Sequence, residues 1–97
     1  MKRSGRATRE SAEILGIQAL AYLAEDGDRL SRFLGLTGIE ADDVRAAARQ
    51  PGFLAGVLEH MLGDESLLVA FADSAGIDPA EIARARSALG GIMEHDG

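Results

Sequence analysis

The stretch PGFLAGVLEHMLGDESLLVAFADSAGIDP, residues 51–79, predicts two consecutive apolar helices, each with a start and a stop signal. In the first helix, apolar side chains recur at i, i+1, i+4, i+5, i+8 and i+9, which forms a wide stripe along one side. These side chains are Phe53, Leu54, Val57, Leu58, Met61 and Leu62. Pro51 suits the first turn, where its missing N–H costs nothing, and Gly63 can close the helix.

The second helix of this stretch is expected to start at an Asp64 cap and to end at Gly76. Its predicted buried side consists of Leu67, Leu68, Phe71, Ala72 and Ala75. The two helices hold most of the large apolar side chains of the second half of the chain. We therefore expect them to pair as the core hairpin of the fold.

Composition favours a single all-α domain. The chain has 97 residues, no tryptophan and only four aromatic side chains, so alanine, leucine and isoleucine must fill the core. No stretch alternates polar and apolar residues long enough to be a strand. We expect a compact bundle of about six short helices. The absence of cysteine excludes disulfides, zinc thiolate sites and cysteine nucleophiles, and it fits a reducing, cytoplasmic location.

The other helices are expected at about residues 9–25, 28–36, 41–49 and 79–89. Asp78-Pro79-Ala80-Glu81 is a good start signal for the last helix, and Gly90-Gly91 is expected to stop it. The predicted organisation is a flexible basic arm (residues 1–9), one all-helical domain (10–91) and a disordered tail (92–97).

The first predicted helix is apolar nearly all round. Its run ILGIQALAYLA, residues 14–24, is too short to span a bilayer. Glu10 and Glu13 before the run and Gln18 within it argue against an export signal. A helix of this kind is either enclosed by other helices or half covered by a partner.

The chain also resembles itself at a shift of 38 residues. Leu20 then falls on Leu58, and the other matches are Asp26 with Asp64, Phe33 with Phe71, Gly38 with Gly76, and Ala47 with Ala85. One explanation is two similar three-helix units, each a helix, a second helix, a Gly-Ile corner and a third helix, and we favour it. The other is convergence, because any two such units need the same caps and core positions.

Charge is divided unevenly along the chain. The formal net charge is −6, but residues 1–9 carry Lys2, Arg3, Arg6 and Arg9 without an acid, and the rest is strongly acidic. An acidic domain repels phosphate backbones and anionic lipid headgroups. Nucleic acid and membranes are therefore not the expected partners.

A helix-turn-helix pattern occurs twice, as Leu34, Gly38 and Val44, and as Ala72, Gly76 and Ile82. The spacing describes how two helices pack across a tight turn and does not by itself indicate DNA binding. Carboxylates at the start of the second helix, including Glu40, Asp42 and Asp43, would face phosphates. A nucleic-acid-binding regulator that uses the basic arm and the four arginines Arg29, Arg32, Arg45 and Arg49 is therefore the alternative hypothesis.

Side chains for catalysis or metal binding are sparse. His60 has no second ligand at a metal-binding spacing, and His95 lies in the predicted tail. No phosphate loop and no nucleophile elbow is present. We expect no catalytic residue, no metal and no cofactor, and hence no enzyme. The possible interaction residues are Arg29, Arg32, Arg45 and Arg49, although solvated ion pairs on an exposed face are the favoured explanation of these arginines.

Several segments resemble a family of short proteobacterial proteins, the domain-of-unknown-function family 3572. The resemblance covers about residues 11–90, and it is carried by Leu23 to Asp26, by Arg32 to Leu34 with Thr37-Gly38, and by Phe53-Leu54-Ala55 leading into Val57-Leu58. It implies an all-helical cytoplasmic protein without an assigned function or assigned site residues.

The resulting functional hypothesis is a small non-enzymatic protein–protein interaction module. Its partner would be another protein or a second copy of the chain, bound at an exposed part of the first helix or between the repeats. No small-molecule substrate is evident from the sequence.

Overall fold

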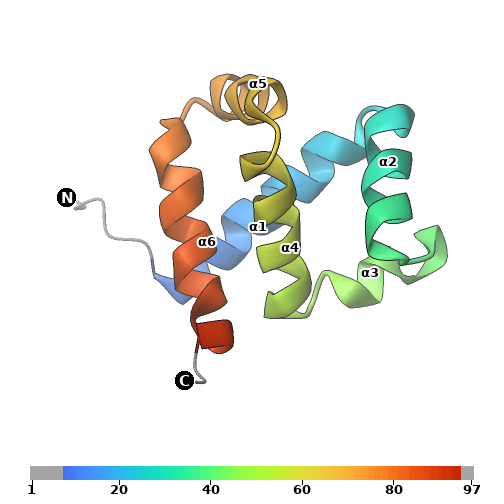
Figure 1. Ribbon diagram of the computed structural model, residues 1–97, viewed down its shortest axis with the longest axis horizontal. Helices are drawn as coiled ribbons and strands as arrows, with labels where there is room; N and C mark the ends of the chain where they lie inside the picture. Colours follow the sequence, from blue (N-terminus) through green and yellow to red (C-terminus); the bar gives the residue numbers. More distant parts are fainter. Residues whose placement is uncertain (1–7, 95–97) are drawn as a thin grey trace.

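Six α-helices joined by tight turns make up the described part of the chain. The computed structural model describes the backbone of residues 8–94 and the side chains of residues 8–89. The elements are α1 (Arg9–Ala24), α2 (Gly27–Thr37), the 3-10 turn η1 (Ala41–Asp43), α3 (Val44–Ala47), α4 (Pro51–Leu62), α5 (Glu65–Ala75) and α6 (Pro79–Glu94) (Figure 1). No strand occurs within residues 8–94, so the predicted all-α class is confirmed. Most of the predicted basic arm, residues 1–7, lies outside the described residues, and Arg9 is the first residue of α1.

The helix starts follow the predicted caps. The Thr8 hydroxyl accepts a hydrogen bond from the Ser11 backbone N–H at 3.0 Å. The Asp64 carboxylate accepts one from Leu67 N–H at 3.2 Å, and that of Asp78 accepts one from Ala80 N–H at 2.9 Å. Each of these bonds satisfies a first-turn N–H that has no partner within its own helix. The element starts are therefore decided locally by the sequence.

Two glycines end their helices in the left-handed conformation. Gly38 has φ 78° and Gly76 has φ 70°, which a residue with a Cβ adopts only at a cost. Gly63, by contrast, ends α4 with φ −82°, so it closes that helix without a left-handed turn.

The predicted end of the last helix is wrong. Helix α6 continues through Gly90 and Gly91 to Glu94, and only residues 95–97 of the predicted tail lie outside the described residues. A glycine inside a helix costs about 1 kcal/mol relative to alanine, which weakens a helix but does not stop it.

The predicted helix at residues 41–49 is divided into η1 and the single turn α3. Gln50 precedes Pro51 and has an extended backbone, with φ −96° and ψ 123°. A residue before proline is forced out of the α region, so the helix must end before it. At the other end, Asp42 and Asp43 favour turn conformations over a helix interior.

The core is formed mainly by α1, α4 and α6, which pack on one another more extensively than α4 packs on α5. The predicted core hairpin of α4 with α5 is therefore wrong as the main pairing. In Figure 1, α5 is seen end-on above α4 and α6, because it crosses the ends of these two helices. The buried residues of α5 are Phe71 and Ala72. Among its predicted buried residues, Leu67 and Leu68 are half-buried and Ala75 is exposed.

The two predicted three-helix units share their caps but differ in their third helix. Asp26 and Asp64 cap equivalent helices, and Gly38 and Gly76 end them. The third element of the first unit is η1 with the four-residue α3, and neither contains a fully buried residue, although Val44 packs against the edge of the core. The third helix of the second unit is α6, which places Ile82, Ala85 and Leu89 in the core. Duplication thus stays a prediction.

Candidate functional site

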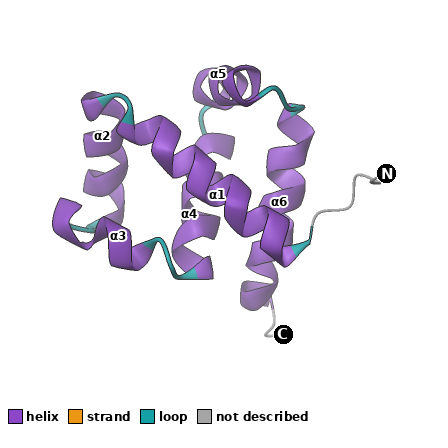
Figure 2. Cartoon of the chain, turned by 180° about the vertical axis from the view of Figure 1, so that it is seen from behind, coloured by secondary structure: helices purple, strands orange, loops and turns teal. Residues whose placement is uncertain are grey.

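Helix α1 runs diagonally across one side of the molecule and has one uncovered face (Figure 2). Its inward face consists of buried residues, namely Ala12, Gly16, Ala19, Leu20 and Leu23. On the outward face, 54% of Ile14 and 49% of Ile17 are exposed. Because α1 is apolar nearly all round, burying one face leaves a second apolar face in water.

The exposed face of α1 has a regular spacing. Ile14, Ile17, Ala21 and Ala24 are all exposed and follow one another at intervals of three, four and three residues. Residues at these intervals lie along one line of a helix, as they do in helices that pack against a second helix. We call these four residues the α1 stripe.

The edges of the α1 stripe are acidic. Glu10 and Glu25 are exposed near its two ends, and Glu13 and Gln18 lie beside it. Oε2 of Glu13 lies 4.0 Å from Nε of Arg9, an ion pair too long and too exposed to contribute much stability. The face therefore has an apolar centre and a predominantly acidic border.

Leu36 of α2, 72% exposed, and Val69 of α5, 51% exposed, are the other large apolar side chains in water among the described residues. Each is the single exposed large apolar side chain on its helix, and isolated apolar side chains of this kind are normal on protein surfaces. They therefore serve as controls for the α1 stripe.

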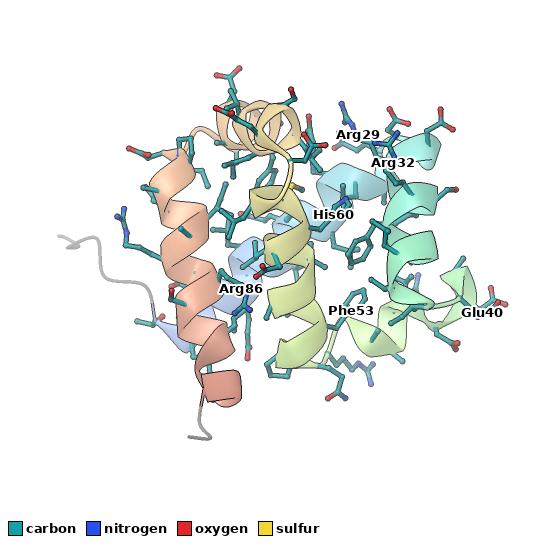
Figure 3. All side chains as sticks on the ribbon, in the orientation of Figure 1. Arg29, Arg32, Glu40, Phe53, His60 and Arg86 are labelled. Carbon is teal, nitrogen blue, oxygen red and sulfur yellow. The ribbon has the colours of Figure 1, made fainter. Side chains whose placement is uncertain are left out.

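A second feature is a surface pocket of about 190 Å³ between α2, α4 and α5, which is open to solvent on one side. We call it the arginine pocket. It is lined by Arg29, Arg32, His60, Asp64, Ser66, Leu67 and Ala70. Figure 3 shows Arg29 and Arg32 at one end of α2, near His60 of α4.

The four arginines singled out in the sequence are divided between two places. Arg29 and Arg32 line the arginine pocket, whereas Arg45 lies on α3 and Arg49 just after it, beyond the other end of α2. Arg45 and Arg49 are both exposed. Binding of duplex DNA by these residues stays the alternative hypothesis, which a salt-dependent mobility shift would test.

His60 lies at the wall of the arginine pocket with its ring 5.1 Å from that of Phe33, centroid to centroid. Burial lowers the pKa of His60 below its usual value of 6.5, the Asp64 carboxylate acts against this, and the Arg32 guanidinium adds to it. The neutral imidazole is thus the form that the fold favours.

This pKa predicts a pH dependence of stability. Since the folded-state pKa lies below the unfolded value of 6.5, the unfolded chain binds more protons around that pH. The free energy of unfolding should therefore fall as the pH is lowered through about 6.5. Urea unfolding of the wild type and of His60→Gln, from about pH 8 to about pH 5, measures this, and His60→Gln should show the smaller fall. Equal falls in both proteins would contradict the prediction.

Within residues 8–94, no helix combines the length and the apolar character that crossing a membrane requires. The same part of the chain has no group of three or more His, Cys, Asp or Glu side chains placed to hold a metal ion.

Comparison with known proteins gives one match. A family model described as "Protein of unknown function (DUF3572)" matches residues 9–92, which is nearly the whole chain. No curated protein and no solved structure matches the sequence.

Proposed function

From the premise that the chain belongs to the DUF3572 family, whose description assigns no function, we propose that it is a non-enzymatic protein-interaction module. Its binding surface is the α1 stripe, and its ligand is an amphipathic helix of a partner protein with basic residues beside its apolar face. The observation that carries the proposal is the exposure of Ile14 and Ile17, about one turn apart on the uncovered face of α1.

The energetic argument for a partner rests on the two isoleucines. Full burial of an isoleucine side chain is worth about 1.5–3 kcal/mol, and Ile14 and Ile17 are each about half exposed. Covering both would therefore contribute about 1.5–3 kcal/mol. Ala21 and Ala24 are small, so a facing helix can approach closely along the rest of the stripe.

In the register that extends along the whole α1 stripe, charge favours a different protein over a second copy as the occupant. An antiparallel pairing that matches Ile14 and Ile17 with Ala24 and Ala21 of a second copy also brings Glu13 towards Glu25 of that copy. Like charges across such a seam are destabilising, and a parallel pairing would align the two helix dipoles. A partner helix that is flanked by lysine or arginine and runs antiparallel to α1 avoids both the like-charge repulsion and the aligned dipoles.

The proposal predicts the effect of Ile17→Lys. A lysine on the α1 stripe should weaken binding of a designed amphipathic peptide with leucines at the same spacing and lysine flanks by at least about tenfold, which is about 1.4 kcal/mol. The substitution lies at the surface, so the free energy of unfolding should change by no more than about 0.5 kcal/mol. Isothermal titration calorimetry and urea unfolding measure the two quantities.

Val69→Lys is the matched control, because Val69 is exposed to nearly the same extent as Ile17 but lies on α5. It should leave peptide binding unchanged. A second peptide with glutamate flanks should bind the wild type more weakly than the lysine peptide does. Equal binding of both peptides, or equal loss in the two variants, would contradict the proposal. If light scattering shows that the wild type is a dimer and that Ile17→Lys dissociates it, the occupant of the α1 stripe is a second copy of the chain and not a partner helix.

The absence of enzymatic activity and the cytoplasmic location are part of the same proposal. A chain without cysteine is suited to a reducing compartment, which supports the location.

A further inference from the structure

The arginine pocket gathers positive charge on a domain that is otherwise acidic. Residues 10–97 hold six arginines against sixteen acids, yet two of those arginines line one cavity with a single carboxylate, that of Asp64. The lining thus has a positive balance before His60 takes up a proton. Such a local excess of positive charge points to an anionic ligand.

The two guanidinium groups are placed in different ways. Arg29 is oriented mainly by stacking, because its guanidinium carbon lies 4.8 Å from the centre of the Tyr22 ring. Its Nε also lies 4.0 Å from Oδ2 of Asp26, an ion pair too long and too exposed to add much. Arg32 takes part in no ion pair with the side chains of residues 8–89. The planar donors of Arg32 are therefore available to a ligand, while Arg29 is already oriented.

The far wall of the pocket offers further hydrogen-bond donors. The Asp64 carboxylate accepts a hydrogen bond from Leu67 N–H, so it is engaged in capping α5. Ser66, which precedes Leu67, lines the pocket and supplies a hydroxyl that can donate a hydrogen bond to an anion. Donors thus lie on two sides of the cavity, from α2 and from the start of α5.

The volume of the pocket suits a small ligand group. A drug-sized ligand occupies a pocket of about 300–1,000 Å³, whereas the arginine pocket measures about 190 Å³. We propose that the arginine pocket binds a phosphate group, as inorganic phosphate or as the head of a small phosphomonoester, between Arg29, Arg32 and Ser66. Arginine forks match the oxygens of a phosphate in pairs, and phosphate carries up to two negative charges near neutral pH. This site is independent of the α1 stripe.

His60 reports on the site. The charged groups that face it are Arg29 and Arg32 from α2 and Asp64 at the start of α5. A bound dianion offsets the charge of Arg32, so it stabilises the protonated imidazole. Occupancy should therefore raise the pKa of His60 by about one unit.

The experiment follows the ring protons of His60 by NMR while sodium phosphate or glycerol phosphate is added at constant ionic strength. His60→Gln assigns the signals. The wild type should show a saturable shift with a dissociation constant of about 1–10 mM. Arg32→Gln should weaken this binding at least tenfold, whereas Arg84→Gln, which removes an exposed arginine from α6, should leave it unchanged. Ser66→Ala, expected to weaken it about fivefold, serves if Arg32→Gln unfolds.

Titrations with different anions identify the source of the phosphate group and distinguish specific binding from a general effect of ionic strength. Saturation by glycerol phosphate, by inorganic phosphate or by both supports the site and identifies its ligand. Sulfate, a tetrahedral dianion that does not titrate near neutral pH, should raise the pKa of His60 as well. A shift that never saturates, that is equal in Arg32→Gln and Arg84→Gln, or that succinate reproduces with equal affinity would overturn the proposal.

Discussion

Replacing Leu58 by alanine is expected to lower the free energy of unfolding by about 2–5 kcal/mol. Leu58 is fully buried on α4, the helix that packs on both α1 and α6. The loss combines the transfer free energy of the removed atoms with the cavity that they leave. A domain of this size is stable by only about 5–15 kcal/mol, so the variant should be close to unfolding at physiological temperature. Urea unfolding followed by circular dichroism measures the change.

The same measurement distinguishes the observed core from the α4–α5 hairpin expected from the sequence. Leu89→Ala removes a fully buried side chain of α6 and should cost about as much as Leu58→Ala. Leu68 of α5 is only partly buried, so Leu68→Ala should cost about 1–2 kcal/mol. A cost for Leu68→Ala equal to that of Leu58→Ala, with Leu89→Ala nearly neutral, would contradict the packing of α1, α4 and α6.

Replacing Gly16 by valine is expected to lower the free energy of unfolding by about 2–3 kcal/mol. A Cβ atom at Gly16 would lie 2.9 Å from Cβ of Leu54, which is closer than side chains pack. Cβ of Leu54 is fixed to the backbone of α4, so the strain can be relieved only if α1 and α4 move apart. That movement would loosen a core to which both helices contribute.

Gly35→Val on α2 is the control for this substitution. A Cβ at Gly35 would meet nothing within 4 Å, and Gly35 is exposed in a helix interior. Valine is a better helix former than glycine, so Gly35→Val should be neutral or stabilise the protein by up to about 0.5 kcal/mol. If Gly16→Val also proved neutral, the close approach of α1 to α4 would be wrong.

The starts and ends of most helices could be predicted because their signals are local. Thr8, Asp64 and Asp78 each cap the helix that immediately follows, and Gly38 and Gly76 adopt the conformation that glycine favours. The pairing of the helices could not be predicted in this way. Helix α4 is apolar on a wide face and can cover several neighbours, so its own sequence does not identify them.

The candidate sites were predictable only in part. The sequence indicates that α1 is apolar nearly all round, but not which side is buried. Gly16 could have indicated the buried side, because a glycine within a helix often marks a close helix contact. The sequence indicates Arg29 and Arg32 as possible interaction residues. Their grouping with His60 and Ser66 depends on the turn between α4 and α5, and no local pattern shows it.

Site-specific photo-cross-linking tests the role of the α1 stripe most directly. A photoreactive amino acid replaces Ile17 in one protein and Leu36, the most exposed large apolar residue, in another, in cells that carry the gene. We expect one prominent cross-linked product from position 17, none from position 36, and attachment within a partner helix flanked by lysine or arginine. The same products from both positions, or a cross-link from position 17 only to a second copy of the chain, would contradict the proposed partner helix.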